Sequence, residues 1–505
     1  MALDISTQTI EIERIIGTKS AQALTRAEAL VPGAGREAIE VLLTDAAVCI
    51  TNMETQTDRI IVEGALHCQA TYRQGDETTL RAVAAQAQLS QVFDIPGATQ
   101  GMSAYACANV EHVEARYENG HMVFLVTTSL RAQAASLTPV EVITAIEGAE
   151  SIETEFVSLC SCKTAAETEA ASLVRAEVAL PAALDARTTL MDRAVATVES
   201  AEADLGGVRV KGIVNVEALI SSGVEGHPAA SVRYALDFDQ LVDVPEWLAK
   251  DVCATACVTR LETRVEQAGD GEDSQLVIDA EVGVHLASIT NDCVDVLTDA
   301  YATAGNVLKL SAAPVELCAD IACLSCTEQV KGTLLLSENA PGVGNVIAVT
   351  ARPNISGWGT NGESTIEGVI EATILYMPGG GDRVVSAQSE LPFSIKCRGT
   401  LNDTSLVCIK VTSAEASAIM SDRVELRCTL VVESSTRMVA EYTRVTGVEE
   451  GANLRRCPGI ILFWPGAGDN LWTIGRRYSM PVEMVKAMNG GSEIVEQGKA
   501  MVLKI

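Results

Sequence analysis

The amino-acid sequence predicts a mainly β protein in which three β-rich, sandwich-like repeats are followed by a small α+β module. Three observations lead to this fold class. Apolar and polar residues alternate over many short segments, which is the period of a half-buried strand. One such segment recurs three times, and turns rich in Gly, Asp and Asn separate the segments, as in sandwiches and partly open barrels. Beyond residue 458 the apolar spacing changes to that of short helices.

The recurring segment carries a glycine at the same place in every copy. A charged residue precedes each glycine, and a large apolar residue follows eight positions later. A glycine inside a strand marks a bulge or a close approach of another backbone, so we expect one of these at each copy. The three copies are Arg59–Tyr72 with Gly64, Val208–Ile220 with Gly212, and Ser364–Met377 with Gly368.

Other elements of the repeat recur in the same order around this segment. A lead-in element occurs at Leu24–Gly33, Leu173–Ala182 and Glu328–Asn339, and a later alternating strand occurs at His121–Leu130, Leu276–Leu286 and Val424–Val432. The predicted repeats therefore cover residues 18–136, 163–290 and 327–433, and the third is the most divergent. Residues 137–162 and 291–326 are predicted connectors. Short helices are expected in the connectors and just after them, for example at Thr164–Val174.

The last predicted domain, residues 458–505, has the order strand, helix, helix, strand. Leu471, Ile474 and Tyr478 share one helical face, and Pro481 suits the start of the second helix. The expected elements are a strand at Ile460–Trp464, a helix capped by Asp469 or Asn470, a second helix ended by Asn489, Gly490 and Gly491, and a strand at Ala500–Ile505.

Charge and composition exclude several classes of protein. The chain of 505 residues has a formal net charge of −30, which disfavours a nucleic-acid partner because phosphates are bound by excess Lys and Arg. No window offers the ~18 consecutive apolar residues that a membrane span requires. The N-terminus lacks the basic and apolar regions of a secretory signal, so a cytoplasmic protein is expected. Residues 458–505 carry five basic and four acidic residues. This contrast fits two parts that face different surfaces, and it equally fits ordinary solvated charge.

The fifteen cysteines are interpreted as reduced thiols, because the chain shows no export signal. Cys323 and Cys326 form a CxxC pair, Cys160 and Cys162 occupy the similar place one repeat earlier, and Cys318 is nearby. These thiols are of the type that binds zinc. Because no second CxxC follows at the spacing of a zinc ribbon, we predict no metal site. Crosslinking of these thiols in an oxidised environment is the alternative.

No enzyme motif is present in the sequence. The five histidines are scattered, and none belongs to an HExxH pattern. The glycine run Gly379–Gly381 lies between two predicted strands and is interpreted as a hairpin loop, not a phosphate cradle. Carboxylates are so numerous that no pair stands out as an acid/base couple. We therefore predict no catalytic residues and no cofactor.

The C-terminal segment resembles a LysM domain. The residues that match the family pattern are Gly468, Asp469, Leu471, Trp472, Ile474, Tyr478, Val482, Met488, Asn489, Gln497 and Gly498. Gly475 stands where the family usually has Ala, which costs roughly 1 kcal/mol of helix propensity, and Val485 stands for the usual Leu. The resemblance implies that N-acetylglucosamine polymers could bind at two loops, Gly468–Leu471 and Met488–Ile494.

The repeats resemble the SPOCS-domain proteins of spore-forming Firmicutes. The resemblance rests on the lead-in with its acidic residue and proline (Glu28 and Pro32, Glu177 and Pro181), on the charged residue before each aligned glycine, and on the segments around Pro96, Pro245 and Pro392. It implies a non-enzymatic scaffold or adaptor of endospore coat assembly, in the mother-cell cytoplasm at the forespore surface. The implied partner is the basement ATPase of the spore coat, with the LysM module contributing to that contact.

The residues expected to bind the partner all lie in the C-terminal module. Trp and Arg are typical anchors of protein interfaces, whereas a place in the core of the module is the alternative for the tryptophan and the isoleucines. The competing hypothesis is a cell-wall or cortex protein whose LysM module binds peptidoglycan. The candidate residues are Ile460, Ile461, Asp469, Leu471, Trp472, Arg476, Arg477 and Asn489.

Overall fold

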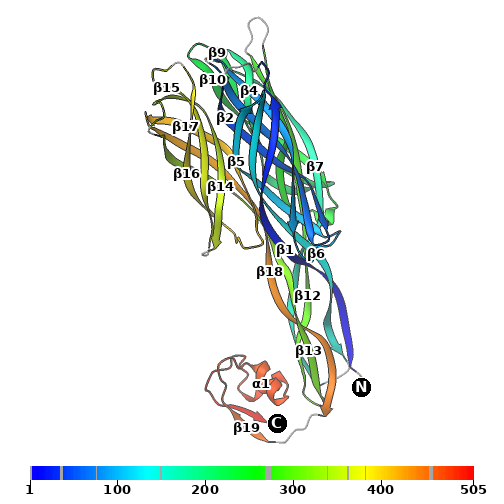
Figure 1. Cartoon of the computed structure of the whole chain (residues 1–505). Coiled ribbons are helices and arrows are strands. Elements are labelled where there is room, and N and C mark those ends of the chain that lie inside the picture. The colour runs from blue at the N-terminus through cyan, green and yellow to red at the C-terminus, as the bar shows by residue number, and fades with distance from the viewer. Residues whose placement is uncertain are drawn as a thin grey trace.

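The computed structural model describes residues 3–33, 38–75, 77–147, 151–267, 274–337, 339–360, 363–381, 383–453 and 459–504. These residues form three successive β-rich units and a small C-terminal module (Figure 1). Residues 458 and 505, the predicted limits of the last domain, lie outside the described residues. Within the described residues, no helix is long and apolar enough to cross a membrane.

Each unit contributes six strands in the same order. The first unit comprises β1 (Asp4–Leu30), β2 (Ile39–Gln56), β3 (Arg59–Gln74), β4 (Leu80–Asp94), β5 (Ser103–Glu118) and β6 (His121–Glu147). The second comprises β7 (Ile152–Ala179), β8 (Ala186–Asp204), β9 (Gly207–Val224), β10 (His227–Asp243), β11 (Val252–Glu266) and β12 (Gln275–Ala302), with short 3₁₀ turns at Ala182–Leu184 and Glu246–Leu248. The third comprises β13 (Asn306–Leu335), β14 (Val343–Thr360), β15 (Ser364–Pro378), β16 (Val385–Cys397), β17 (Leu406–Met420) and β18 (Arg423–Asn453).

Every unit folds as a pair of three-stranded antiparallel sheets. In the first unit the sheets have the orders β2-β3-β4 and β1-β6-β5, and the same arrangement recurs as β8-β9-β10 with β7-β12-β11 and as β14-β15-β16 with β13-β18-β17. The apolar face of each middle strand enters the core between the two sheets, as Ile60 and Leu66 of β3 do with Met122 and Phe124 of β6. The predicted mainly β class and its repetition along the chain are therefore confirmed.

The aligned glycines lie opposite β-bulges, as the sequence predicted. Across from Gly64, Gly212 and Gly368, the neighbouring strand shifts register between Ile50 and Asn52, Val198 and Ser200, and Ile355 and Gly357. A Cβ at Gly212 would collide with the carbonyl oxygen of Thr197 and lie 2.6 Å from the Phe238 ring. Gly368 meets a carbonyl and a phenylalanine in the same way. At Gly212 and Gly368 a carbonyl of the bulged strand and an aromatic ring thus fill the space of a side chain, whereas at Gly64 the Cys49 carbonyl alone lies 2.8 Å from the Cβ position.

In each unit the first and last strands pair along their whole length. These long antiparallel pairs, β1 with β6, β7 with β12 and β13 with β18, extend beyond the sandwiches and form a common stalk (Figure 1). We define the head as the sandwiches and the stalk as the outer halves of these strand pairs. Each pair has a register shift at the boundary between head and stalk, after Ile15, Ser288 and Cys318. The stalk comprises residues 4–15 with 135–147, 152–164 with 289–302, and 306–318 with 439–453.

The stalk corrects the prediction for the connectors. Residues 137–162 and 291–326 are mostly strand, and Thr164–Val174, where a helix was expected, belongs to β7. The alanine- and glutamate-rich composition there favours a helix, but pairing with β12 along the whole segment overrides that local propensity. The repeat limits 18–136, 163–290 and 327–433 stay predictions.

Buried regions in the head, at the boundary of head and stalk, and along the stalk join the three units into one body. In the head, apolar residues of all three units meet, among them Leu43, Met191 and Leu375. Where head and stalk meet, the Arg437 guanidinium of β18 pairs with the Glu13 carboxylate of β1 at 2.6 Å, and both side chains are almost fully buried. Thr164 of β7 donates its backbone N–H to Glu13, so this ion pair links all three units.

The C-terminal module has the predicted order of strand, helix, helix and strand. Its elements are β19 (Ile460–Phe463), α1 (Leu471–Tyr478), α2 (Val482–Met488) and β20 (Met501–Lys504). Asn470 caps α1 by accepting the Thr473 N–H at 2.8 Å, one of the two caps expected. The core contains Ile474, Met480, Val485, Met501 and Leu503.

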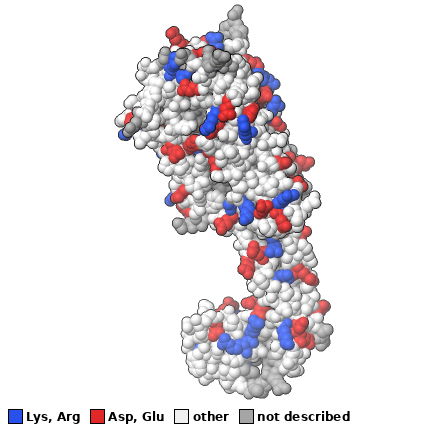
Figure 2. Space-filling view, in the orientation of Figure 1, with Lys and Arg blue, Asp and Glu red and all other residues white. Residues whose placement is uncertain are grey.

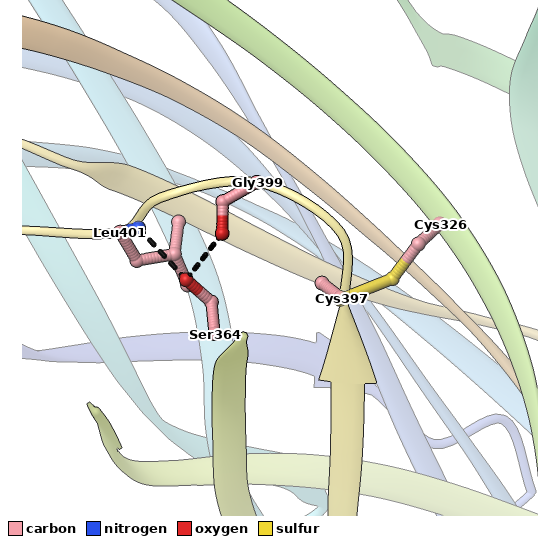
Figure 3. The surroundings of a disulfide bond; sticks show 5 residues. All are labelled: Cys326, Ser364, Cys397, Gly399 and Leu401. Carbon is pink, nitrogen blue, oxygen red and sulfur yellow. Dashed lines mark hydrogen bonds between the residues drawn. A yellow bond between two sulfur atoms is a disulfide. The ribbon is translucent and has the colours of Figure 1, made fainter. Parts of the chain in front are cut away.

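The cysteines differ from the prediction of reduced thiols. Among the residues that the structure describes, six cysteines form the disulfides Cys160–Cys293, Cys253–Cys323 and Cys326–Cys397, whereas eight others are free. The two cysteines of the CxxC pair have different partners because residues three apart on a strand point to opposite faces. Figure 3 shows the bond from β13 to the end of β16, beside a loop where Ser364 accepts the Leu401 N–H. Sequence spacing alone does not reveal this pairing.

Candidate functional site

The candidate site lies on the C-terminal module, which sits beside the free end of the stalk (Figure 1). Figure 2 shows Lys and Arg side chains gathered where the module approaches the stalk, next to acidic ones. Helix α1 faces the strand end of β12 across this junction. The junction therefore joins two parts of the chain that are far apart in the sequence.

Trp472 and Arg476 bind one carboxylate of the stalk. They are four residues apart in α1 and therefore project from the same face of the helix. The Trp472 Nε1–H donates to Oδ2 of Asp299 at 2.8 Å, and the Arg476 guanidinium donates to the same oxygen at 2.6 Å. The Asp299 side chain is only 12% exposed, and its other oxygen accepts the Ala300 N–H. Asp299 thus anchors the module to the stalk.

Tyr301, two residues further along β12, makes the second half of this junction. Its ring meets the Trp472 ring edge-on, with 4.9 Å between the centroids. Its hydroxyl donates to the Met480 carbonyl at 2.9 Å, and burial raises the pKa of the phenol. A Cβ at Gly475 would collide with the Tyr301 hydroxyl. Gly475 therefore leaves room for the Tyr301 hydroxyl.

Arg476 also balances negative charge at the stalk end. The pKa of Glu155 is raised by burial first and by the neighbouring Asp299 second, while Arg476 lowers it. Two carboxylates close together disfavour ionisation of each other, and a nearby guanidinium relieves that repulsion. The docked module therefore supplies the cation that this end of the acidic body requires.

Arg477 and Asp469 form a separate pair on the module. The Arg477 guanidinium lies 3.1 Å from Oδ1 of Asp469 and stacks over the Phe463 ring at 5.2 Å. The other Asp469 oxygen accepts the Gly466 N–H at 2.8 Å, which fixes the loop before α1. These contacts hold the module together, and Arg477 remains half exposed.

Asn489 has a structural role in the module. Its side chain donates to the carbonyls of Val485 and Val502 and accepts the Val502 N–H at 2.7 Å. These three bonds join the end of α2 to β20. Ile461 and Leu471 are partly buried against the module core, so for Ile461 a place in the core is the better interpretation.

Ile460 belongs to an exposed apolar face that sequence reasoning only partly identified. Ile460 is 72% exposed, Leu462 57% and Trp464 59%, and Val502 of the paired strand β20 is exposed beside Leu462. The alternation of β19 places Ile460 and Ile461 on opposite faces, so they do not form one patch. The period of two was the signal that could have identified Leu462 and Trp464. No signal pointed to Asp299 and Tyr301, because they are distant in the sequence.

Comparison with known proteins identifies one family in this chain. Residues 37–118 match the family model described as SipL, SPOCS domain. None of the curated proteins and none of the solved structures matches the chain. The matched segment covers β2 to β5 of the first unit. A SPOCS domain is therefore present, and it marks the chain as a sporulation protein related to the spore coat, a family context that suggests no catalytic role.

Proposed function

We propose that this protein is a non-enzymatic scaffold or adaptor of endospore coat assembly. It acts in the mother-cell cytoplasm at the forespore surface, where it recruits or stabilises the coat basement ATPase, SpoIVA. The observation that carries this proposal is the match to the SipL SPOCS domain, because that family name implies an interaction with SpoIVA. The second and third units repeat the paired sheets of the matched unit, which supports the same domain type along the body.

The contact with the ATPase is assigned to the C-terminal module, which we interpret as a LysM domain. The module has the strand, helix, helix, strand order of that resemblance, and it stands apart from the head at the far end of the stalk (Figure 1). It also differs from the acidic body in charge. Trp472, Arg476, Arg477 and the exposed residue Ile460 supply the aromatic, guanidinium and apolar groups that serve as interface anchors.

A second candidate function is binding of peptidoglycan by the same module. The stalk covers one face of α1, while the two loops implied in glycan binding stay open: Asn470, Gly490 and Ile494 are all exposed. A cell-wall or cortex protein that reads N-acetylglucosamine polymers would use this open end of the module.

A binding experiment with two ligands separates the candidates. The full chain and a chain that ends at residue 453 are compared for capture of the purified ATPase and for sedimentation with peptidoglycan. We expect the truncation to abolish ATPase capture, while neither chain sediments with peptidoglycan. Undiminished ATPase capture by the truncated chain would remove the assigned role of the module. If the full chain sediments with peptidoglycan and the truncated chain does not, the result would favour glycan binding by the module.

A further inference from the structure

The stalk end makes polar contacts with three residues of the docked module, Trp472, Arg476 and Met480. Oδ2 of Asp299 accepts from both Trp472 and Arg476, and the Tyr301 hydroxyl donates to the Met480 carbonyl. With the module docked, the Asp299 side chain is only 12% exposed, and departure of the module exchanges its cation Arg476 and its second donor Trp472 for water. Charge-assisted hydrogen bonds are the stronger class, and this geometry therefore favours the docked state.

The sequence of α1 is adapted to this contact. Gly475 lacks the side chain that would collide with the Tyr301 hydroxyl, although glycine lowers helix propensity. A Cβ there would also meet the Met480 carbonyl of the module at 2.9 Å, so the glycine serves the turn after α1 as well. The same position therefore permits both that turn and the close approach of α1 to the stalk.

The face of α1 that meets the stalk carries Trp472 and Arg476, an aromatic and a guanidinium anchor, and the Arg476 side chain stays 54% exposed while it binds Asp299. Trp472 packs edge-on against Tyr301, and its indole N–H is already bonded. A partner that uses Trp472 and Arg476 must first replace the stalk. When a binding-competent state is only fractionally populated, the apparent affinity falls by that fraction.

We propose that Asp299 and Tyr301 form an autoinhibitory clasp, which holds the module closed against the stalk and competes with the ATPase for the α1 face. This inference rests on the proposed function, because it assumes that the module contacts the ATPase. It adds that the chain binds the ATPase weakly while the module is docked on the stalk, and that the undocked module is the form that binds. The body thereby regulates the module that it carries.

The test uses the full chain with the double variant Asp299→Asn, Tyr301→Phe, which removes one charge and one hydroxyl with little change in side-chain size. The matched control is Asp295→Asn, because Asp295 belongs to the same strand and is less buried than Asp299. Two quantities are measured. One is the affinity for the purified ATPase. The other is the ¹⁹F resonance of Trp472 in chain labelled with 5-fluorotryptophan, assigned by its loss in Trp472→Phe.

We expect the double variant to bind the ATPase about tenfold more tightly and to move the Trp472 resonance toward its solvent-exposed position, while the control changes neither. An unmoved resonance would overturn the clasp. An affinity of the double variant for the ATPase that is equal to or weaker than that of the native chain would also overturn the clasp. If truncation at residue 453 still abolishes binding in that case, the proposed function stands without the clasp. A full chain with no affinity for the ATPase would overturn both proposals.

Discussion

The three units of the body and the C-terminal module are joined to the rest of the chain in different ways. The units share a buried ion pair, an apolar cluster and a disulfide from β11 to β13, so their arrangement is fixed at many points. Among the described residues, the module meets the stalk at Asp299 and Tyr301, which bond Trp472, Arg476 and the Met480 carbonyl. Many buried contacts produce a rigid body, whereas a few polar contacts permit two states. In the proposed clasp, the three units therefore keep one arrangement, and the module is the part that changes between the docked and undocked states.

The largest expected effect tests the rigid part. Arg437→Ala leaves the Glu13 carboxylate buried without its cation, and we expect the free energy of unfolding to fall by about 3–5 kcal/mol. Urea unfolding followed by circular dichroism measures this loss. The matched control is Arg427→Ala, which removes an exposed arginine of the same strand and should change stability by less than ~1 kcal/mol. Equal losses would show that the buried pair does not hold the units together.

The next effect tests the fold of one unit without touching its interfaces. Gly212→Ala puts a methyl group against the Thr197 carbonyl and the Phe238 ring, so we expect a loss of about 1–3 kcal/mol. Gly357→Ala is the control, because nothing lies within 4 Å of the methyl group it would add. Both are measured by the midpoint of urea unfolding. If both alanines are tolerated equally, the bulge does not explain the recurring glycine.

A smaller effect tests the module. Gly475→Ala should weaken docking, because its methyl group meets the Tyr301 hydroxyl, and its contact of 2.9 Å with the Met480 carbonyl of the module offsets the roughly 1 kcal/mol of helix propensity that alanine adds. We expect the Trp472 ¹⁹F resonance to shift in this variant, and we expect Gly475→Ala to add a smaller shift in a Tyr301→Phe background than in the native chain, because the hydroxyl that its methyl group meets is then absent. A double-mutant cycle of the docking equilibrium gives the coupling between the two positions. Zero coupling would mean that the glycine has another purpose.

The smallest effect is a pH dependence inside the second unit. The Glu167 carboxylate, 3.4 Å from His285, raises the pKa of the imidazole above its ordinary value of 6.5. A raised pKa in the folded chain adds stability below pH 6.5, and this contribution disappears as the pH rises through the folded pKa. Thermal unfolding of the native chain and of His285→Gln should therefore differ more at about pH 6 than at about pH 8. A difference that grows with pH would contradict this assignment.

Alternation of apolar residues predicted the strands well, because each sandwich has one face buried and one exposed. The same local pattern was enough to identify Gly64, Gly212 and Gly368 as bulge positions. The helix expected at Thr164–Val174 was wrong, since pairing with β12 over a long distance decides that segment. In the module, Trp472 and Arg476 were candidates because of their residue types, but the sequence could not reveal that Asp299 of the body binds both.

The sequence by itself determined the class of fold, the repetition of the unit and the strand, helix, helix, strand order of the last domain. Each of these depends on local periodicity, which neighbouring residues carry. Only the tertiary structure decided the shared stalk, the disulfide partners and the docking of α1 on the stalk end. Those features join residues that are 70 or more positions apart, for example Cys253 with Cys323 and Asp299 with Trp472. A local sequence pattern contains no information about contacts over such distances.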